Sequence, residues 1–99
     1  MKENVIEGNK LIRKFCEHDH LPYKFNYHED WNDLMPVVEK IYLLREVKEV
    51  SIRPGRTRIW LQQSYIQSPC KPENNSITEC WLAVTEFVQY YNTQKTNTP

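Results

Sequence analysis

The residue types best suited to binding gather around a predicted hairpin turn. Arg53, Arg56 and Arg58 follow one another at short spacing, with Lys48 before them and Trp60 just after. Guanidinium groups form paired hydrogen bonds with carboxylates and phosphates. Arginine and tryptophan are over-represented among residues that dominate interface energies. These five residues form the candidate partner-binding set, for RNA or an acidic protein patch. The alternative is a solvated turn whose charges protect the sheet edges.

A second group of ligand-type side chains lies in residues 16–20, which read CEHDH, and His28 lies on a neighbouring predicted strand. A structural zinc site takes four nitrogen or sulfur ligands in a tetrahedron. This segment supplies a single thiol, Cys16, and its spacing matches none of the usual closed sites. We therefore expect a solvated loop without a bound metal, and we expect no cofactor.

Side chains for covalent or acid–base catalysis form no recognisable set. None of the serines lies in a nucleophile elbow, and the only glycines, Gly8 and Gly55, form no phosphate-binding loop. Glu29 and Asp30 are adjacent in sequence, which gives no reason for their carboxylates to converge on a substrate. The sequence therefore predicts a protein that is not an enzyme and takes no small-molecule substrate.

The element before the hairpin is predicted to be an amphipathic helix. Asp30 is its cap, a short first turn covers Trp31–Met35, and a regular helix runs from Pro36 to near Arg45. The apolar side chains recur at helical spacing and predict a buried stripe. The stripe consists of Trp31, Leu34, Met35, Val38, Ile41 and Tyr42.

Two further helices are predicted near the ends of the chain. The first covers about Val5 to Cys16, and Gly8 inside it indicates close packing or support from tertiary contacts. The last opens with a capping box, in which Ser76 and Glu79 exchange hydrogen bonds, and ends near Asn92.

Strands are predicted from residues that alternate between apolar and polar. Residues 23–28 form the first strand, and residues 50–52 and 57–62 form a hairpin closed by a type II turn at 53–56. Arg58 and Trp60 share the hairpin face opposite Ile59 and Leu61. Trp60 is core if helices cover both faces of the sheet, and it is an interface anchor beside Arg58 if one face is open.

The predicted order is α-β-α-β-β-α. The strand at residues 23–28, the helix after it and the strand at residues 50–52 form a right-handed crossover that can place these two strands in parallel. The fold class is α/β (α+β). A three-stranded sheet packs against three helices in an α/β/α sandwich-like arrangement, with helices on both faces. Residues 1–92 form a single domain, and residues 93–99 form a flexible polar tail.

Composition limits the classes of function. The 99 residues include 13 basic and 13 acidic side chains, which argues against a dedicated nucleic-acid binder. No apolar run is long enough to span a membrane, so the expected location is the cytoplasm. The three cysteines, Cys16, Cys70 and Cys80, have no paired spacing, which argues against a disulfide framework.

Several stretches resemble the phage ABA sandwich domain family, in a version similar to those of Bacteroidota and their mobile elements. The matching stretches lie near both ends of the chain and in its middle. They are residues 6–12, Trp31 with 34–41, 81–84, 86–88 and 91–92. The resemblance implies an α/β/α layered domain and carries no chemistry.

The resemblance and the missing catalytic set together favour a phage or mobile-element accessory protein that binds a host protein. Its most concrete form is a host-defence antagonist. This is an anti-CRISPR-like inhibitor of an RNA-guided effector nuclease or its guide complex. One alternative is a phage protein of unassigned role that binds RNA weakly through the arginine turn. Another is a homodimeric structural protein.

Overall fold

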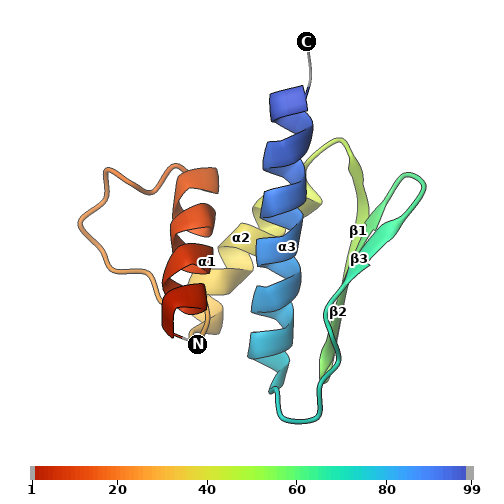
Figure 1. The fold of residues 1–99 in the computed structure, drawn as a ribbon, viewed down its shortest axis with the longest axis horizontal. Coiled ribbons are helices and arrows are strands. Elements are labelled where there is room, and N and C mark those ends of the chain that lie inside the picture. Colours follow the sequence, from red (N-terminus) through yellow and green to blue (C-terminus); the bar gives the residue numbers. More distant parts are fainter. Residues whose placement is uncertain (1, 98–99) are drawn as a thin grey trace.

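The computed structural model describes residues 2–97 and the side chains of residues 4–94. Three helices and a three-stranded antiparallel sheet follow one another in the order α-α-β-β-β-α (Figure 1). The α+β class is as predicted, but the order is not. The elements are α1 (Lys2–Phe15), α2 (Trp31–Tyr42), β1 (Val47–Arg53), β2 (Arg56–Leu61), β3 (Tyr65–Gln67) and α3 (Ser76–Asn97).

The strand predicted at residues 23–28 is wrong, because this segment belongs to a long loop between α1 and α2. Its aromatic rings do share one side, but they stack on each other instead of lying in a sheet. The ring of Phe25 stacks on that of Tyr27, with centroids 5.3 Å apart. The His18 ring also stacks on Phe25, with centroids 4.3 Å apart. The backbone N–H of Asn26 donates to the Asp33 carboxylate at 2.7 Å and not to a neighbouring strand.

The third strand is β3, which the sequence did not indicate. It pairs antiparallel with β2, as β1 does, so the parallel crossover expected from residues 23–28 is also wrong. The β1–β2 hairpin itself is confirmed. Gly55 in its turn has a φ of 73°, the left-handed conformation that a type II turn requires and that glycine adopts readily.

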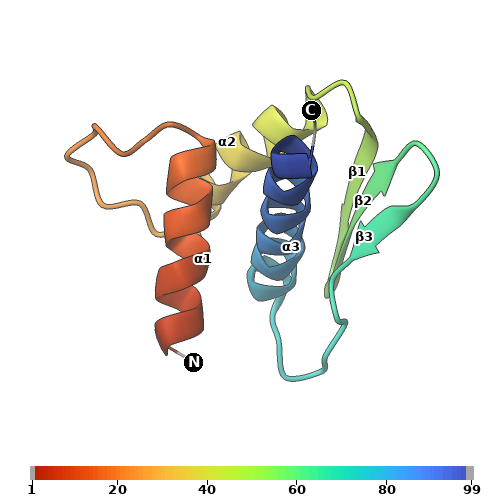
Figure 2. The same ribbon diagram turned by 45° about the horizontal axis from the view of Figure 1, so that its top comes forward.

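All three helices lie on the same side of the sheet (Figures 1 and 2). Helix α3 packs on β2 and β3, α2 packs on β1 and α3, and α1 packs on α3. The predicted α/β/α layering is therefore wrong. The layers are the sheet, then α3 with α2, then α1, and no helix described between residues 2 and 97 covers the other face of the sheet. The core between sheet and helices includes Ile59, Leu61, Ile66, Leu34, Ile41, Val84 and Phe87.

Helix α2 begins at the predicted cap, where Asp30 Oδ1 accepts from the backbone N–H of Asn32 at 2.8 Å. The helix runs through Pro36 without a break. Part of the predicted stripe is wrong, because Trp31, Met35 and Tyr42 are exposed. The buried stripe is narrower and consists of Leu34, Val37, Val38 and Ile41.

Helices α1 and α3 approach each other at Gly8, as its position inside a helix suggested. A Cβ atom at Gly8 would lie 2.4 Å from Cζ2 of Trp81. The Trp81 indole N–H donates to Oδ1 of the adjacent Asn9 at 2.8 Å, which holds the ring in place.

The predicted capping box at the start of α3 is wrong. Asn75 Oδ1 accepts from the backbone N–H of Thr78 at 2.9 Å and takes the capping role. Ser76 Oγ instead accepts from the backbone N–H of Gly55 at 2.9 Å, which ties the hairpin turn to this helix. The Glu79 carboxylate turns toward the preceding loop and accepts from the backbone N–H groups of Cys70 and Lys71.

Helix α3 continues to Asn97, beyond the expected end at Asn92 and into the segment assigned to a tail. Residues 98 and 99 of that predicted tail lie outside the described residues. None of the helices described between residues 2 and 97 has the length and apolar character needed to cross a membrane.

Candidate functional site

The uncovered side of the sheet, called the open face here, is defined by strand register. Alternation places Thr57, Ile59 and Leu61 of β2 toward the helices, and all three are buried. Arg58 and Trp60 therefore point to the open face. Their cross-strand partners lie on the same face. The open face consists of Glu49, Ser51, Arg53, Arg56, Arg58, Trp60, Tyr65 and Gln67.

The centre of the open face is Arg58, whose guanidinium group is held from several sides. Its Nε donates to Gln67 Oε1 at 2.8 Å, and its Nη2 donates to the same oxygen. The guanidinium carbon lies 5.1 Å from the centroid of Trp60 and 4.8 Å from that of Tyr65. These are cation–π distances. The side chain is ordered before any partner arrives, which lowers the entropy lost on binding.

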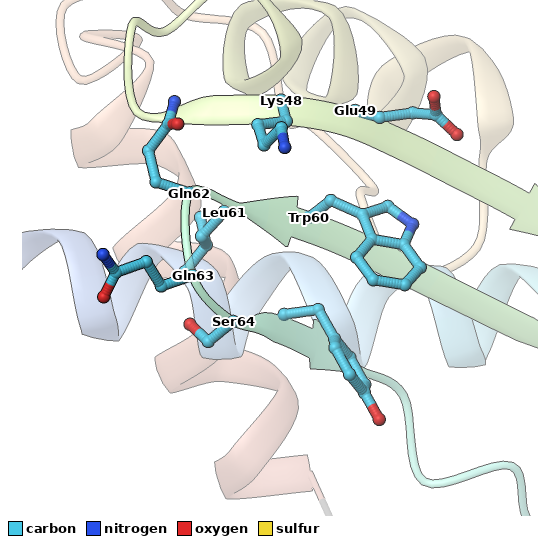
Figure 3. A pocket seen from close by; sticks show the side chains of 8 residues that line it. Lys48, Glu49, Trp60, Leu61, Gln62, Gln63 and Ser64 are labelled. Carbon is cyan, nitrogen blue, oxygen red and sulfur yellow. The ribbon is translucent and has the colours of Figure 1, made fainter.

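An open hollow of about 570 Å³ lies beside Trp60 and Tyr65, at the end of the sheet where β2 turns into β3 (Figure 3). Lys48 and Glu49 of β1 border it on one side, and Gln62, Gln63 and Ser64 of the turn border it at the end. Aromatic walls with polar groups at the rim are typical of places where a partner side chain is buried.

The charges of the molecule are distributed unevenly. The chain has 13 basic and 13 acidic residues and no net charge. The open face with its hollow nevertheless carries Arg53, Arg56, Arg58 and Lys48 against one acidic side chain, Glu49. A basic surface of this kind attracts acidic partners and steers their approach.

The five residues proposed from the sequence divide into two groups on this face. Arg58 and Trp60 lie together, and Lys48 borders the same hollow as Trp60. Arg53 and Arg56 pair across the hairpin at the turn, at the opposite end of the strands. The turn is joined to α3, because its Gly55 N–H donates to Ser76 Oγ at 2.9 Å.

The sequence reasoning missed the partners of Arg58. Tyr65, whose side chain is 52% exposed, and Gln67 both come from β3, which was not predicted. The only sequence signal for β3 is one apolar residue between two polar or amphipathic ones, since Ile66 is buried and Tyr65 and Gln67 point outward.

The ligand-type side chains of residues 16–20 serve the loop itself. His18 Nδ1 lies 2.8 Å from the Tyr27 hydroxyl, and Asp19 lies 3.6 Å from Nε of Arg13. Burial, together with the nearby charges of Arg13 and Lys40, lowers the pKa of His18, and burial raises the pKa of the Cys16 thiol.

The histidine considered in addition to that cluster, His28, has other partners. Its Nδ1 lies 3.0 Å from Asn9 Nδ2, and its Nε2 lies 3.3 Å from the Glu29 carboxylate. Within the part of the chain that the structure describes, no three His, Cys, Asp or Glu side chains are grouped so that they could hold a metal ion.

Comparisons with family models, with curated proteins and with solved structures found no significant match to this chain. The resemblance to the phage ABA sandwich domain family therefore stays an expectation from the sequence. The site must be interpreted from its own geometry.

Proposed function

We propose that this chain is a non-enzymatic binding protein whose open face docks another protein. The observation that carries the proposal is the fixed position of Arg58 between Trp60, Tyr65 and Gln67, on a sheet face that none of the described helices covers. Interfaces concentrate their binding energy in a few aromatic and arginine side chains surrounded by weaker contacts. Here such side chains adjoin a hollow that a partner residue can fill.

The chemistry of Arg58 indicates the partner group. Gln67 occupies the side of the guanidinium group formed by Nε and Nη2. The end formed by Nη1 and Nη2 remains available, and two parallel N–H groups suit a carboxylate. With the basic residues around it, this favours an acidic patch on the partner protein.

The resemblance to phage proteins supplies the biological setting of this proposal. In that setting the chain acts in the cytoplasm of a bacterial host as a phage or mobile-element accessory protein. Its partner is then a host-defence protein, in the most concrete case an RNA-guided effector nuclease or its guide complex. The resemblance supports this setting, and the geometry of the open face supports the mode of binding.

The host-defence form is tested with purified effector nucleases loaded with guide RNA. The wild-type chain should inhibit cleavage of target DNA, and Arg58→Glu or Trp60→Ala should weaken inhibition by at least about tenfold. Lys10→Glu is the matched control, because Lys10 is exposed on α1, away from the sheet. Equal inhibition by Arg58→Glu would exclude the open face, and a panel with no inhibited effector would contradict the host-defence role.

A second candidate function is binding of single-stranded RNA. Aromatic and arginine side chains exposed on a sheet are the elements that stack bases and contact phosphates. The Arg58 guanidinium lies over both aromatic rings, which leaves less ring surface for bases and favours the protein partner.

Salt dependence separates the two candidates. Capture from bacterial lysate is carried out with wild type, Arg58→Glu and Lys10→Glu, with and without nuclease treatment. A protein retained after nuclease treatment, and lost only with Arg58→Glu, supports protein binding. Recovery of nucleic acid alone, with affinity that falls steeply as salt rises, supports the RNA alternative.

A further inference from the structure

The outer edge of β1 is a free strand edge. In the sheet, Ser68 N–H donates to Thr57 O at 2.9 Å, so the backbone groups of Thr57 point to β3 and those of Arg58 point to β1. Ser51, the partner of Arg58, therefore points its backbone groups to β2, and its neighbours Val50 and Ile52 point theirs away from the sheet. Within the described chain, these outward groups have no hydrogen-bond partner.

The free edge of β1 is limited at both of its ends. A bulge at Lys48 interrupts the ladder at one end, and Pro54 follows the strand at the other. Lys48 and Pro54 lie at equal distances in sequence from Ser51. The usable edge is thus residues 49–53, centred on Ser51. The other edge, β3, covers only Tyr65–Gln67 and offers less.

We propose that this edge pairs with the same edge of a second copy of the chain, antiparallel and with Ser51 opposite the partner's Ser51. The reason is the pattern of side chains, which is self-complementary in this register. Val50 faces the partner's Ile52 on the helix side, where both residues are half-buried in the single chain. Glu49 faces the partner's Arg53 on the open face, and both are exposed in the single chain. The two-fold symmetry repeats the Val50–Ile52 pair and the Glu49–Arg53 pair, while the Ser51 pair lies on the axis.

The symmetry of this pairing agrees with the fold. Antiparallel pairing of like strands places a two-fold axis perpendicular to the sheet, which preserves its two faces. Two three-stranded sheets then become one six-stranded sheet with all helices on one side and both open faces on the other. Opposite charges and apolar residues directly across an antiparallel pair stabilise it, and the outward N–H and C=O groups of Val50 and Ile52 gain partners.

The inference is independent of the proposed function and is tested by the oligomeric state of the purified chain. Sedimentation over a range of concentrations should show a monomer–dimer equilibrium for wild type. Glu49→Arg or Arg53→Glu alone should raise the dissociation constant about tenfold or more, because each creates like-charge pairs twice in the interface. The double variant should restore dimerisation, and the two single variants should form a heterodimer when mixed.

A backbone variant tests the edge without altering charge. Ile52→Pro removes an N–H that points away from β2, so the β1–β2 ladder remains while dimerisation is lost. Circular dichroism confirms that each variant is folded. A wild type that stays monomeric at millimolar concentration, or a dimer unaffected by both Glu49→Arg and Ile52→Pro, would overturn the inference.

Discussion

Glu79 is a fully buried carboxylate whose partners all come from the loop before α3. Its oxygens accept from the N–H of Cys70 at 2.6 Å, that of Lys71 at 3.1 Å and the side-chain amide of Asn74 at 2.8 Å. Burial alone would raise the pKa of Glu79, but these hydrogen bonds outweigh it and lower the pKa. The residue therefore anchors the connection between β3 and α3 in its charged form.

The lowered pKa of Glu79 predicts that the protein loses stability in acid. Because the folded pKa lies below the unfolded value, the stabilisation is complete above the unfolded pKa and is lost as pH falls through the folded pKa. Glu79→Gln should lower the unfolding free energy at pH 7 by about 2 kcal/mol, since Gln cannot accept from all three donors. Urea unfolding between pH 7 and pH 3 measures this.

The same titration provides the control for Glu79. Glu73→Gln changes an exposed carboxylate in the same loop and should leave stability at pH 7 nearly unchanged. The wild-type curve should fall more steeply below the unfolded pKa than the Glu79→Gln curve. Parallel curves for these two proteins would show that Glu79 is not the group responsible.

At the scale of elements, local signals predicted best where a helix or hairpin is regular. The cap at Asp30 and the turn at Gly55 were recognised from residue type, because each requires a particular local conformation. Residues 23–28 misled because stacked rings in a loop and side chains of a strand both place every second residue on one side. The difference lies in the hydrogen-bond partner of the backbone, which for Asn26 is the side chain of Asp33 in α2 and not a neighbouring strand.

Other misses reflect tertiary context in the same way. Strand β3 is too short for alternation to be visible, and its pairing with β2 decides its structure. Trp31, Met35 and Tyr42 share helical spacing with the buried residues of α2 but lie outside its contacts with β1 and α3. Helical spacing shows which residues share a face, and the neighbouring elements decide how wide the buried part of that face is.

The contact between α1 and α3 gives a prediction at this scale. Gly8→Ala would improve helix propensity by about 1 kcal/mol, but its Cβ would overlap the Trp81 ring, which Asn9 holds and which is 5% exposed. We expect a net loss of about 1–3 kcal/mol in unfolding free energy, as in overpacked cores. Thermal or urea unfolding measures this loss.

Lys10→Ala is the comparison for Gly8→Ala. It changes an exposed position of the same helix and removes only a surface ion pair with Glu7, so its effect should be small. A Gly8→Ala protein as stable as wild type would mean that the two helices can separate at this point without loss.

At the scale of the whole molecule, the decisive feature is the placement of all helices on one side of the sheet (Figure 2). The sequence predicted that Arg58 and Trp60 share a face and left open whether that face was covered. Neither alternation nor composition contains that information, because it depends on where α1 packs. Helix α1 packs on α3 and not on the sheet, so the face of the sheet opposite the helices is uncovered. Trp60 lies on that face and is therefore part of the candidate binding surface and not of the core.

Adjacent residues of β2 test this layering directly. Ile59 faces the helices and is 1% exposed, so Ile59→Ala should lower the unfolding free energy by about 2–5 kcal/mol. Trp60, its neighbour, faces the open side and packs on Arg58 and Tyr65. Trp60→Ala should therefore lower the unfolding free energy by only about 1 kcal/mol, although it removes the larger side chain. Denaturant unfolding of both variants gives the comparison. A sandwich with helices on both faces would make the Trp60 variant the less stable of the two, since the larger cavity would then lie in a covered core.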